Sequence, residues 1–66
     1  LQPLSVRELT ILRMVGEGLT SKEIAESLHS SVRTIENTIA RISNKLGIRG
    51  RAKLIRIALR YSLPSS

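Results

Sequence analysis

Several kinds of residue are missing or rare in this chain of 66 residues, and each absence removes a class of function. There is no Cys, so neither a disulfide nor a thiolate metal site can hold the fold together. With no Asp and one His, the groups for a metal cluster or a nucleophile–base–acid triad are missing, so we expect no enzyme, no metal and no cofactor. Tyr61 is the single aromatic residue, which removes the stacking surface that RNA and single-strand binders use. No apolar run is long enough to predict a membrane-spanning helix.

The positive charge of the chain is concentrated in its second half. Residues 1–30 contain three Lys or Arg and four Glu, whereas residues 31–66 contain eight Lys or Arg and one Glu. The net charge of +6 therefore lies almost wholly after residue 30. Such asymmetry predicts a polyanionic partner, either nucleic acid or an anionic membrane surface. The alternative is a basic surface that serves only solubility.

The length and the start of the sequence bear on its organisation. Sixty-six residues are enough for one small domain. The chain begins Leu1-Gln2-Pro3 rather than with Met, and no charged leader with an apolar stretch and a cleavage site follows. We therefore expect residues 1–66 to be a single domain, excised from a longer protein, and we expect that protein to be cytoplasmic.

Apolar residues recur with helical spacing along the whole chain. Two Ser/Thr-x-x-Glu patterns, which begin at Ser5 and at Thr20, have the form of capping boxes and predict two helix starts. Ser31 predicts a third start, and Gly50 can cap a fourth helix. We predict an all-α four-helix bundle with helices at about residues 5–17, 21–28, 32–47 and 51–62.

The third predicted helix has two contrasting faces. One is a narrow aliphatic stripe with members at i, i+4, i+7 and i+11: Ile35, Ile39, Ile42 and Leu46. At about 100° per residue, the opposite face is polar and comprises Arg33, Asn37, Ala40 and Asn44, flanked by Glu36 and Arg41. A short helix, a tight turn and a longer helix with a polar outer face are typical of a helix-turn-helix, which binds double-stranded DNA. This interpretation favours nucleic acid over a membrane as the polyanion.

The fourth predicted helix has more apolar surface than one small core can cover. Its three cations, Lys53, Arg56 and Arg60, share one narrow face, and most of the remaining circumference is apolar. We predict that part of this helix meets another protein surface. Three residues on one side form the predicted pairing surface, although burial in the core would explain them nearly as well: Leu54, Ile57 and Tyr61.

From Leu4 to Leu63 the chain resembles the LuxR/FixJ/GerE family of bacterial helix-turn-helix domains. Five motifs in order carry the resemblance: Leu4-Ser5-x-Arg7-Glu8, Gly18-x-Thr20-Ser21-Lys22-Glu23-Ile24-Ala25, Ser31-x-x-Thr34-Ile35, Lys45-Leu46-Gly47-Ile48 and Arg51-x-x-Leu54. The resemblance implies a four-helix DNA-binding domain at the C-terminus of a transcription regulator. In such regulators a response-regulator receiver or a signal-binding domain often comes first.

The resemblance also implies roles for individual positions. The third helix would lie in the major groove, with Glu36, Asn37 and Ala40 at positions that usually face base edges. Lys22 and Thr34 match positions that hold phosphates, and the fourth helix matches the element through which two domains pair on DNA. Their chemistry makes four further residues expected phosphate contacts: Arg33, Arg41, Asn44 and Lys45. We expect no membrane partner, a weak homodimer and a possible contact with RNA polymerase.

Four positions depart from the family pattern, and two other functions stay open. Glu36 stands where Lys is frequent and Thr38 where His is common, which leaves the DNA sequence preference open. Ser30 replaces an aliphatic residue, and Gly50 replaces a frequent Asn or Asp cap. The first alternative function is a promoter-reading domain of the sigma-factor type, which would also contact core polymerase. The second is a protein-interaction module that uses the fourth helix.

Overall fold

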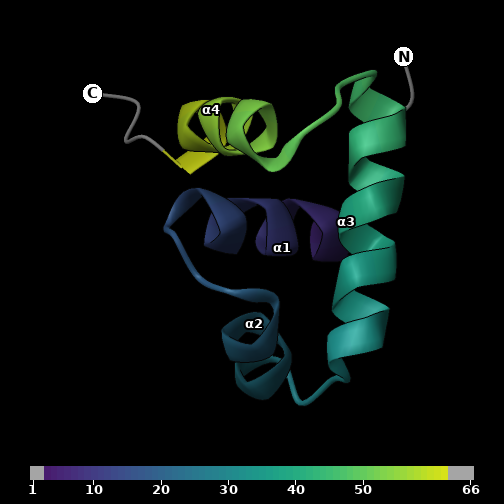
Figure 1. Ribbon diagram of the computed structural model, residues 1–66, viewed down its shortest axis with the longest axis vertical. Coiled ribbons are helices and arrows are strands. Elements are labelled where there is room, and N and C mark those ends of the chain that lie inside the picture. Colours follow the sequence, from purple (N-terminus) through teal and green to yellow (C-terminus); the bar gives the residue numbers. More distant parts are fainter. Residues whose placement is uncertain (1–2, 63–66) are drawn as a thin grey trace.

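The computed structural model describes residues 3–62, without the side chains of Arg51, Tyr61 and Ser62. This part of the chain holds four helices and no strand, which confirms the predicted all-α fold (Figure 1). Every predicted helix end lies within one residue of the observed end. None of the four helices is long and apolar enough to cross a membrane. The helices are α1 (Val6–Gly16), α2 (Ser21–Ser27), α3 (Val32–Leu46) and α4 (Arg51–Ser62).

Side-chain caps begin the first three helices, as their sequences predict. The Ser5 hydroxyl accepts from the Glu8 backbone N–H at 3.1 Å, and Glu8 Oε1 accepts from the Ser5 N–H at 2.9 Å. The capping box at the start of α2 has the same reciprocal form. Ser31 caps α3 by accepting from the Thr34 N–H at 3.1 Å. These bonds satisfy backbone donors that would otherwise lack partners at each start.

The turn between α2 and α3 is closed by a residue with a left-handed backbone. His29 has φ of 55° and follows the last turn of α2. Its N–H donates to the Glu26 carbonyl, and the Ser30 N–H donates to the Ala25 carbonyl at 2.8 Å, which is the pattern of a Schellman motif. Glycine usually occupies this position, and His adopts positive φ more readily than most residues. The exposed His29 is thus a turn residue, and it allows a tight reversal into α3.

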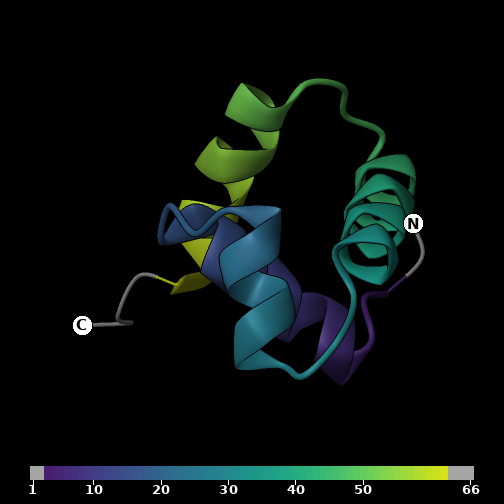
Figure 2. The ribbon, with the colours of Figure 1, turned by 60° about the horizontal axis from the view of Figure 1, so that its bottom comes forward.

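The core lies between α1 and the other three helices. α1 packs against each of them, most extensively against α4 (Figures 1 and 2). The predicted stripe of α3 divides, because Ile35 and Ile42 are fully buried whereas Ile39 and Leu46 pack at the edge of the core. The buried apolar residues are Ile11, Leu12, Val15, Ile24, Ala25, Ile35, Ile42, Leu54 and Ala58.

The arrangement of α4 corrects part of the predicted pairing surface. Leu54 is only 1% exposed and belongs to the core, so its side chain is not available to a second copy. Ile57 is half-buried, and the Tyr61 side chain lies outside the described residues. The sequence also predicted that one core cannot cover all the apolar surface of this helix. The outer side of α4 agrees with this prediction, because Leu59 is 43% exposed.

Gly16 determines how closely α4 approaches α1. Gly16 is the last residue of α1 and lies directly against Ala58 of α4. A Cβ at Gly16 would lie 2.8 Å from the Ala58 Cβ and 3.1 Å from its carbonyl carbon. Because backbone atoms contribute to this contact, any side chain at residue 16 must displace α4.

We predict that Gly16→Ala lowers the free energy of unfolding by up to about 2 kcal/mol. Overpacking in a core costs about 1–3 kcal/mol, and the higher helix propensity of Ala offsets about 1 kcal/mol of this. Urea denaturation measures the change. The double variant Gly16→Ala/Ala58→Gly should be more stable than the sum of the two single changes implies, because it restores space between the helices. Strict additivity would show that the Gly16–Ala58 contact does not limit the packing of α4.

Candidate nucleic-acid interface

The polar face predicted for α3 is exposed to solvent. This face lies opposite the fully buried side chains of Ile35 and Ile42. Thr34, on its flank, is exposed too. The described structure therefore confirms the orientation of the helix that the aliphatic stripe predicted. The exposed members are Arg33, Glu36, Asn37, Ala40, Arg41 and Asn44.

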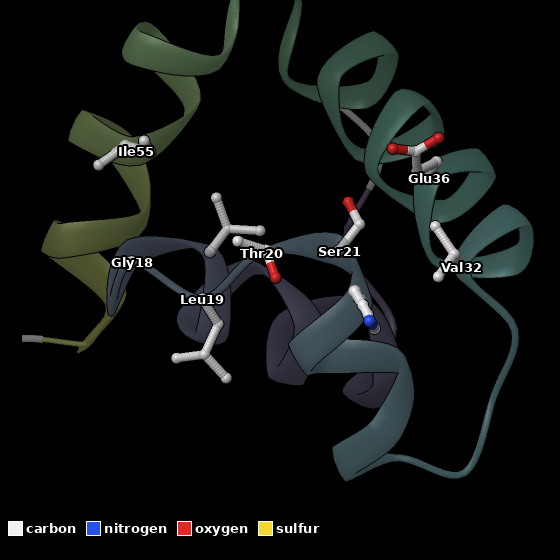
Figure 3. A pocket seen from close by; sticks show the side chains of 9 residues that line it. Gly18, Leu19, Thr20, Ser21, Val32, Glu36 and Ile55 are labelled. Atoms are coloured by element: carbon white, nitrogen blue, oxygen red, sulfur yellow. The ribbon is translucent and has the colours of Figure 1, made fainter.

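One flank of this face adjoins the start of α2. A pocket of about 480 Å³ lies between α2, α3 and α4, and both Lys22 and Glu36 line it (Figure 3). Lys22 is exposed, which leaves its ammonium group accessible beside α3. The Ser21 hydroxyl is buried in the same region and has no hydrogen-bond partner among the residues that the structure describes. The pocket thus places one cation of α2 next to the exposed face of α3.

A short chain of hydroxyl groups lies on the other flank of α3. The Ser31 hydroxyl donates to Thr34 Oγ1 at 2.8 Å, and Thr38 Oγ1 donates to the Thr34 carbonyl at 2.9 Å. Thr38 is buried, with 7% of its surface exposed. Thr38 and Glu36 both depart from the family pattern. Thr38 faces the protein interior, whereas Glu36 lies on the exposed face of α3.

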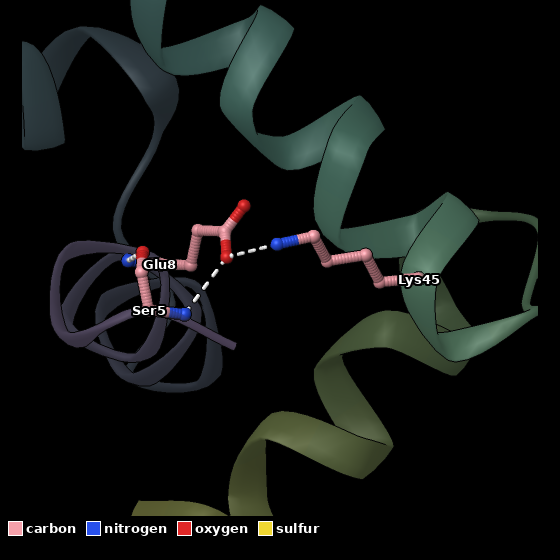
Figure 4. A network of polar contacts seen from close by, with 3 residues as sticks. All are labelled: Ser5, Glu8 and Lys45. Carbon is pink, nitrogen blue, oxygen red and sulfur yellow. Dashed lines mark hydrogen bonds and ion pairs between the residues drawn. The ribbon is translucent and has the colours of Figure 1, made fainter. Parts of the chain in front are cut away.

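Lys45 has a different place from the one its sequence suggested. Its Nζ lies 2.8 Å from Glu8 Oε1, and its side chain is only 22% exposed (Figure 4). The interaction joins the last turn of α3 to the first turn of α1. Lys45 is therefore held against α1 in the free domain rather than extended from the polar face. A carboxylate 37 positions away cannot be identified from the periodicity of a single helix.

The environment of Glu8 favours its ionised form. The hydrogen bond from Lys45, followed by the one from the Ser5 backbone N–H, holds the pKa of the Glu8 carboxyl below its ordinary value. The carboxylate is nearly inaccessible, with 4% of the residue exposed, so its charge depends on these partners rather than on water. Within residues 3–62, no group of His, Asp or Glu side chains is arranged to hold a metal ion.

Comparison with known proteins agrees with this geometry. Residues 2–58 match the model of "Bacterial regulatory proteins, luxR family". The chain is 42% identical over 57 residues to the response regulator Rre1 of Synechocystis, and the match covers 86% of this chain and 25% of Rre1. It is 43% identical over 60 residues to the oxygen regulatory protein NreC of Staphylococcus aureus, covering 91% of this chain and 28% of NreC. The chain thus spans about a quarter of the length of these relatives. No solved structure matches it.

We predict that the stability of the domain falls in acid partly because Glu8 becomes protonated. A carboxyl whose pKa is lower in the folded state binds protons more weakly there than in the unfolded chain, so its contribution is complete above the ordinary pKa of about 4.5. That contribution is lost as the pH falls through the lower pKa of the folded protein. Urea denaturation between neutral pH and pH of about 2.5 measures the slope. Glu8→Gln should flatten this slope, and an unchanged slope in this variant would contradict the prediction.

Proposed function

Because the chain belongs to the luxR family of bacterial regulatory proteins, we propose that it binds double-stranded DNA and regulates transcription in the bacterial cytoplasm. The observation that carries this proposal is the exposed polar face of α3, whose opposite side packs into the core through Ile35 and Ile42. The names of its relatives, a response regulator and an oxygen regulatory protein, fit a role as the DNA-binding part of a longer regulator.

We propose that α3 lies in the major groove and reads bases through three residues. The Asn37 amide can form two hydrogen bonds with N6 and N7 of adenine. The ionised Glu36 can only accept hydrogen bonds, so the N4 amino group of cytosine is its natural target, and it repels misplaced phosphates. Ala40 permits a close approach and can contact a thymine methyl group. All three side chains are exposed on the same face, which is the arrangement that this role requires.

Affinity would come from contacts with phosphates around this face. Lys22 at the start of α2 has an exposed ammonium group beside α3. Exposed residues of α3 itself provide further donors: Arg33, Thr34, Arg41 and Asn44. Lys45 contributes less than its sequence suggested, because Glu8 already binds it. Such contacts hold the protein on the duplex without reading its sequence.

We also propose that two copies pair through α4 when they occupy adjacent half-sites. Leu54 cannot contribute directly because it is buried, but Ile48, Ile57 and Leu59 line an open groove of about 580 Å³ on the outer side of the helix. Lys53, Arg56 and Arg60 border the same groove, and their mutual repulsion opposes pairing in free solution. Pairing is therefore expected to be weak until DNA phosphates offset this charge.

We predict that the domain binds a duplex selected from a random pool with a strong dependence on salt. If about five phosphates are neutralised by each domain, log affinity should fall against log salt with a slope of about −4 to −5. Fluorescence anisotropy across a range of salt concentrations measures the slope. The selected sequence also reports the spacing of half-sites and hence pairing. Binding that ignores salt, or the absence of duplex binding at low salt, would contradict the proposed function.

We predict that Asn37→Ala and Lys22→Ala weaken binding in different ways. Loss of the Asn37 amide should cost about 1–3 kcal/mol of discrimination at one base pair and little affinity for a scrambled duplex. Loss of the Lys22 ammonium should lower the affinity for both duplexes equally and reduce the magnitude of the salt slope by about 0.9. Competition binding with single-base variants of the selected site measures both effects. Equal losses for every sequence with Asn37→Ala would remove this residue from the base-reading set.

A further inference from the structure

A second groove lies on the side of α3 that faces α1. It has a volume of about 300 Å³ and runs between the first turn of α1 and one face of α3. Arg7 lies on its α1 wall, while Thr34, Asn37 and Arg41 lie on its α3 wall. Arg7, Thr34, Asn37 and Arg41 are all exposed. The groove therefore opens beside the face of α3 that carries the proposed base contacts.

The groove has an excess of positive charge that the fold leaves available. Glu8 is the one carboxylate among its lining residues, and Lys45 together with the capping N–H of Ser5 compensates its charge. Neither Arg7 nor Arg41 has a carboxylate within ion-pair distance among the residues that the structure describes. The lining therefore includes two guanidinium groups that no carboxylate among the described residues neutralises.

The Thr34 hydroxyl group in the groove can donate a hydrogen bond to a ligand. Thr34 Oγ1 accepts the hydrogen bond from the Ser31 hydroxyl at 2.8 Å, so its own proton is not used in that bond. The lining thus supplies two planar guanidinium groups and, besides Thr34, the hydroxyl groups of Ser5 and Thr38, of which Thr38 already donates to a carbonyl. Guanidinium groups match the tetrahedral oxygens of a phosphodiester and bind them with charge-assisted hydrogen bonds.

We propose that this groove binds a backbone phosphate of duplex DNA and that Arg7 of α1 is one of its ligands. The inference rests on the proposed function and extends it. The Lys22 pocket borders α3 on the side of Glu36, whereas the Arg7 groove borders α3 on the side of Thr34 and Arg41. A helix in the major groove has a phosphate backbone on each side. The two flanks of α3 thus each hold one strand, and α1 takes part in binding as well as in the core.

The test is Arg7→Gln, measured against the matched control Arg13→Gln. Both residues are exposed arginines of α1, but Arg13 lies on a surface with Met14 and Glu17, outside this groove. We expect Arg7→Gln to lower the affinity for both the selected and the scrambled duplex about tenfold. It should also reduce the magnitude of the salt slope by about 0.9. Arg13→Gln should change neither quantity. Circular dichroism confirms that both variants remain folded.

A scan of the duplex with single methylphosphonates, which remove the charge of one phosphate at a time, identifies the contact. When a methylphosphonate replaces the phosphate in this groove, binding by the wild-type protein should weaken. Binding by Arg7→Gln should weaken little further, because this variant has already lost the interaction. If Arg7→Gln matches Arg13→Gln while the wild-type protein binds with a steep salt slope, this inference is wrong and the proposed function stands. If the wild-type protein binds neither duplex, both fail together.

Discussion

The carboxylate of Glu8 links α1 to α3, and the placement of the exposed face of α3 depends on this link. One of its oxygens accepts from the first turn of its own helix, at the Ser5 N–H, and from Lys45 at the end of α3. A buried carboxylate without such donors would be costly, so the position of α3 against α1 is coupled to the cap of α1. The other end of α3 is held by the turn at His29. α3 is therefore anchored at both ends, and its outer face has one orientation relative to α1 and α2.

The packing of α4 supports the same orientation from the opposite side of α1. Gly16 lets the backbone of α4 approach closely at Ala58, and Leu54 fills the core beside this contact. Because α4 lies on α1 and makes few contacts with α3, the exposed face of α3 stays uncovered. The core thus forms around α1, while one side of α3 remains exposed to solvent. A helix that carries function on one face and stability on the other needs this division.

Local features of the fold could be predicted from the sequence, and long-range contacts could not. The boxes at Ser5 and Thr20 and the aliphatic stripe of α3 depend on residues within one or two helical turns, so their spacing suffices to identify them. The Glu8–Lys45 bond and the role of Gly16 depend on helices that meet only after folding. Leu54 shows the same limit, because a wide apolar arc does not reveal which part of it enters the core. The inward position of Thr38 follows from its rotation about α3, between the buried Ile35 and Ile42.

The distribution of charge around α3 separates affinity from selectivity. The centre of its exposed face carries three residues without charge, Asn37, Ala40 and Asn44, and one cation, Arg33, in the first turn of the helix. Glu36 stands at one edge beside Lys22, and Arg41 stands at the other edge beside the α1 groove. In the proposed complex, attraction to phosphates would act mainly through Arg33 and the cations at the flanks, and it would be independent of sequence. The uncharged residues of this face would add little attraction for a wrong site in this complex, and the carboxylate of Glu36 would oppose any placement that brings a phosphate toward it. In the proposed complex, the net charge of +6 would favour approach to any duplex, while Glu36, Asn37 and Ala40 would decide which duplex is retained.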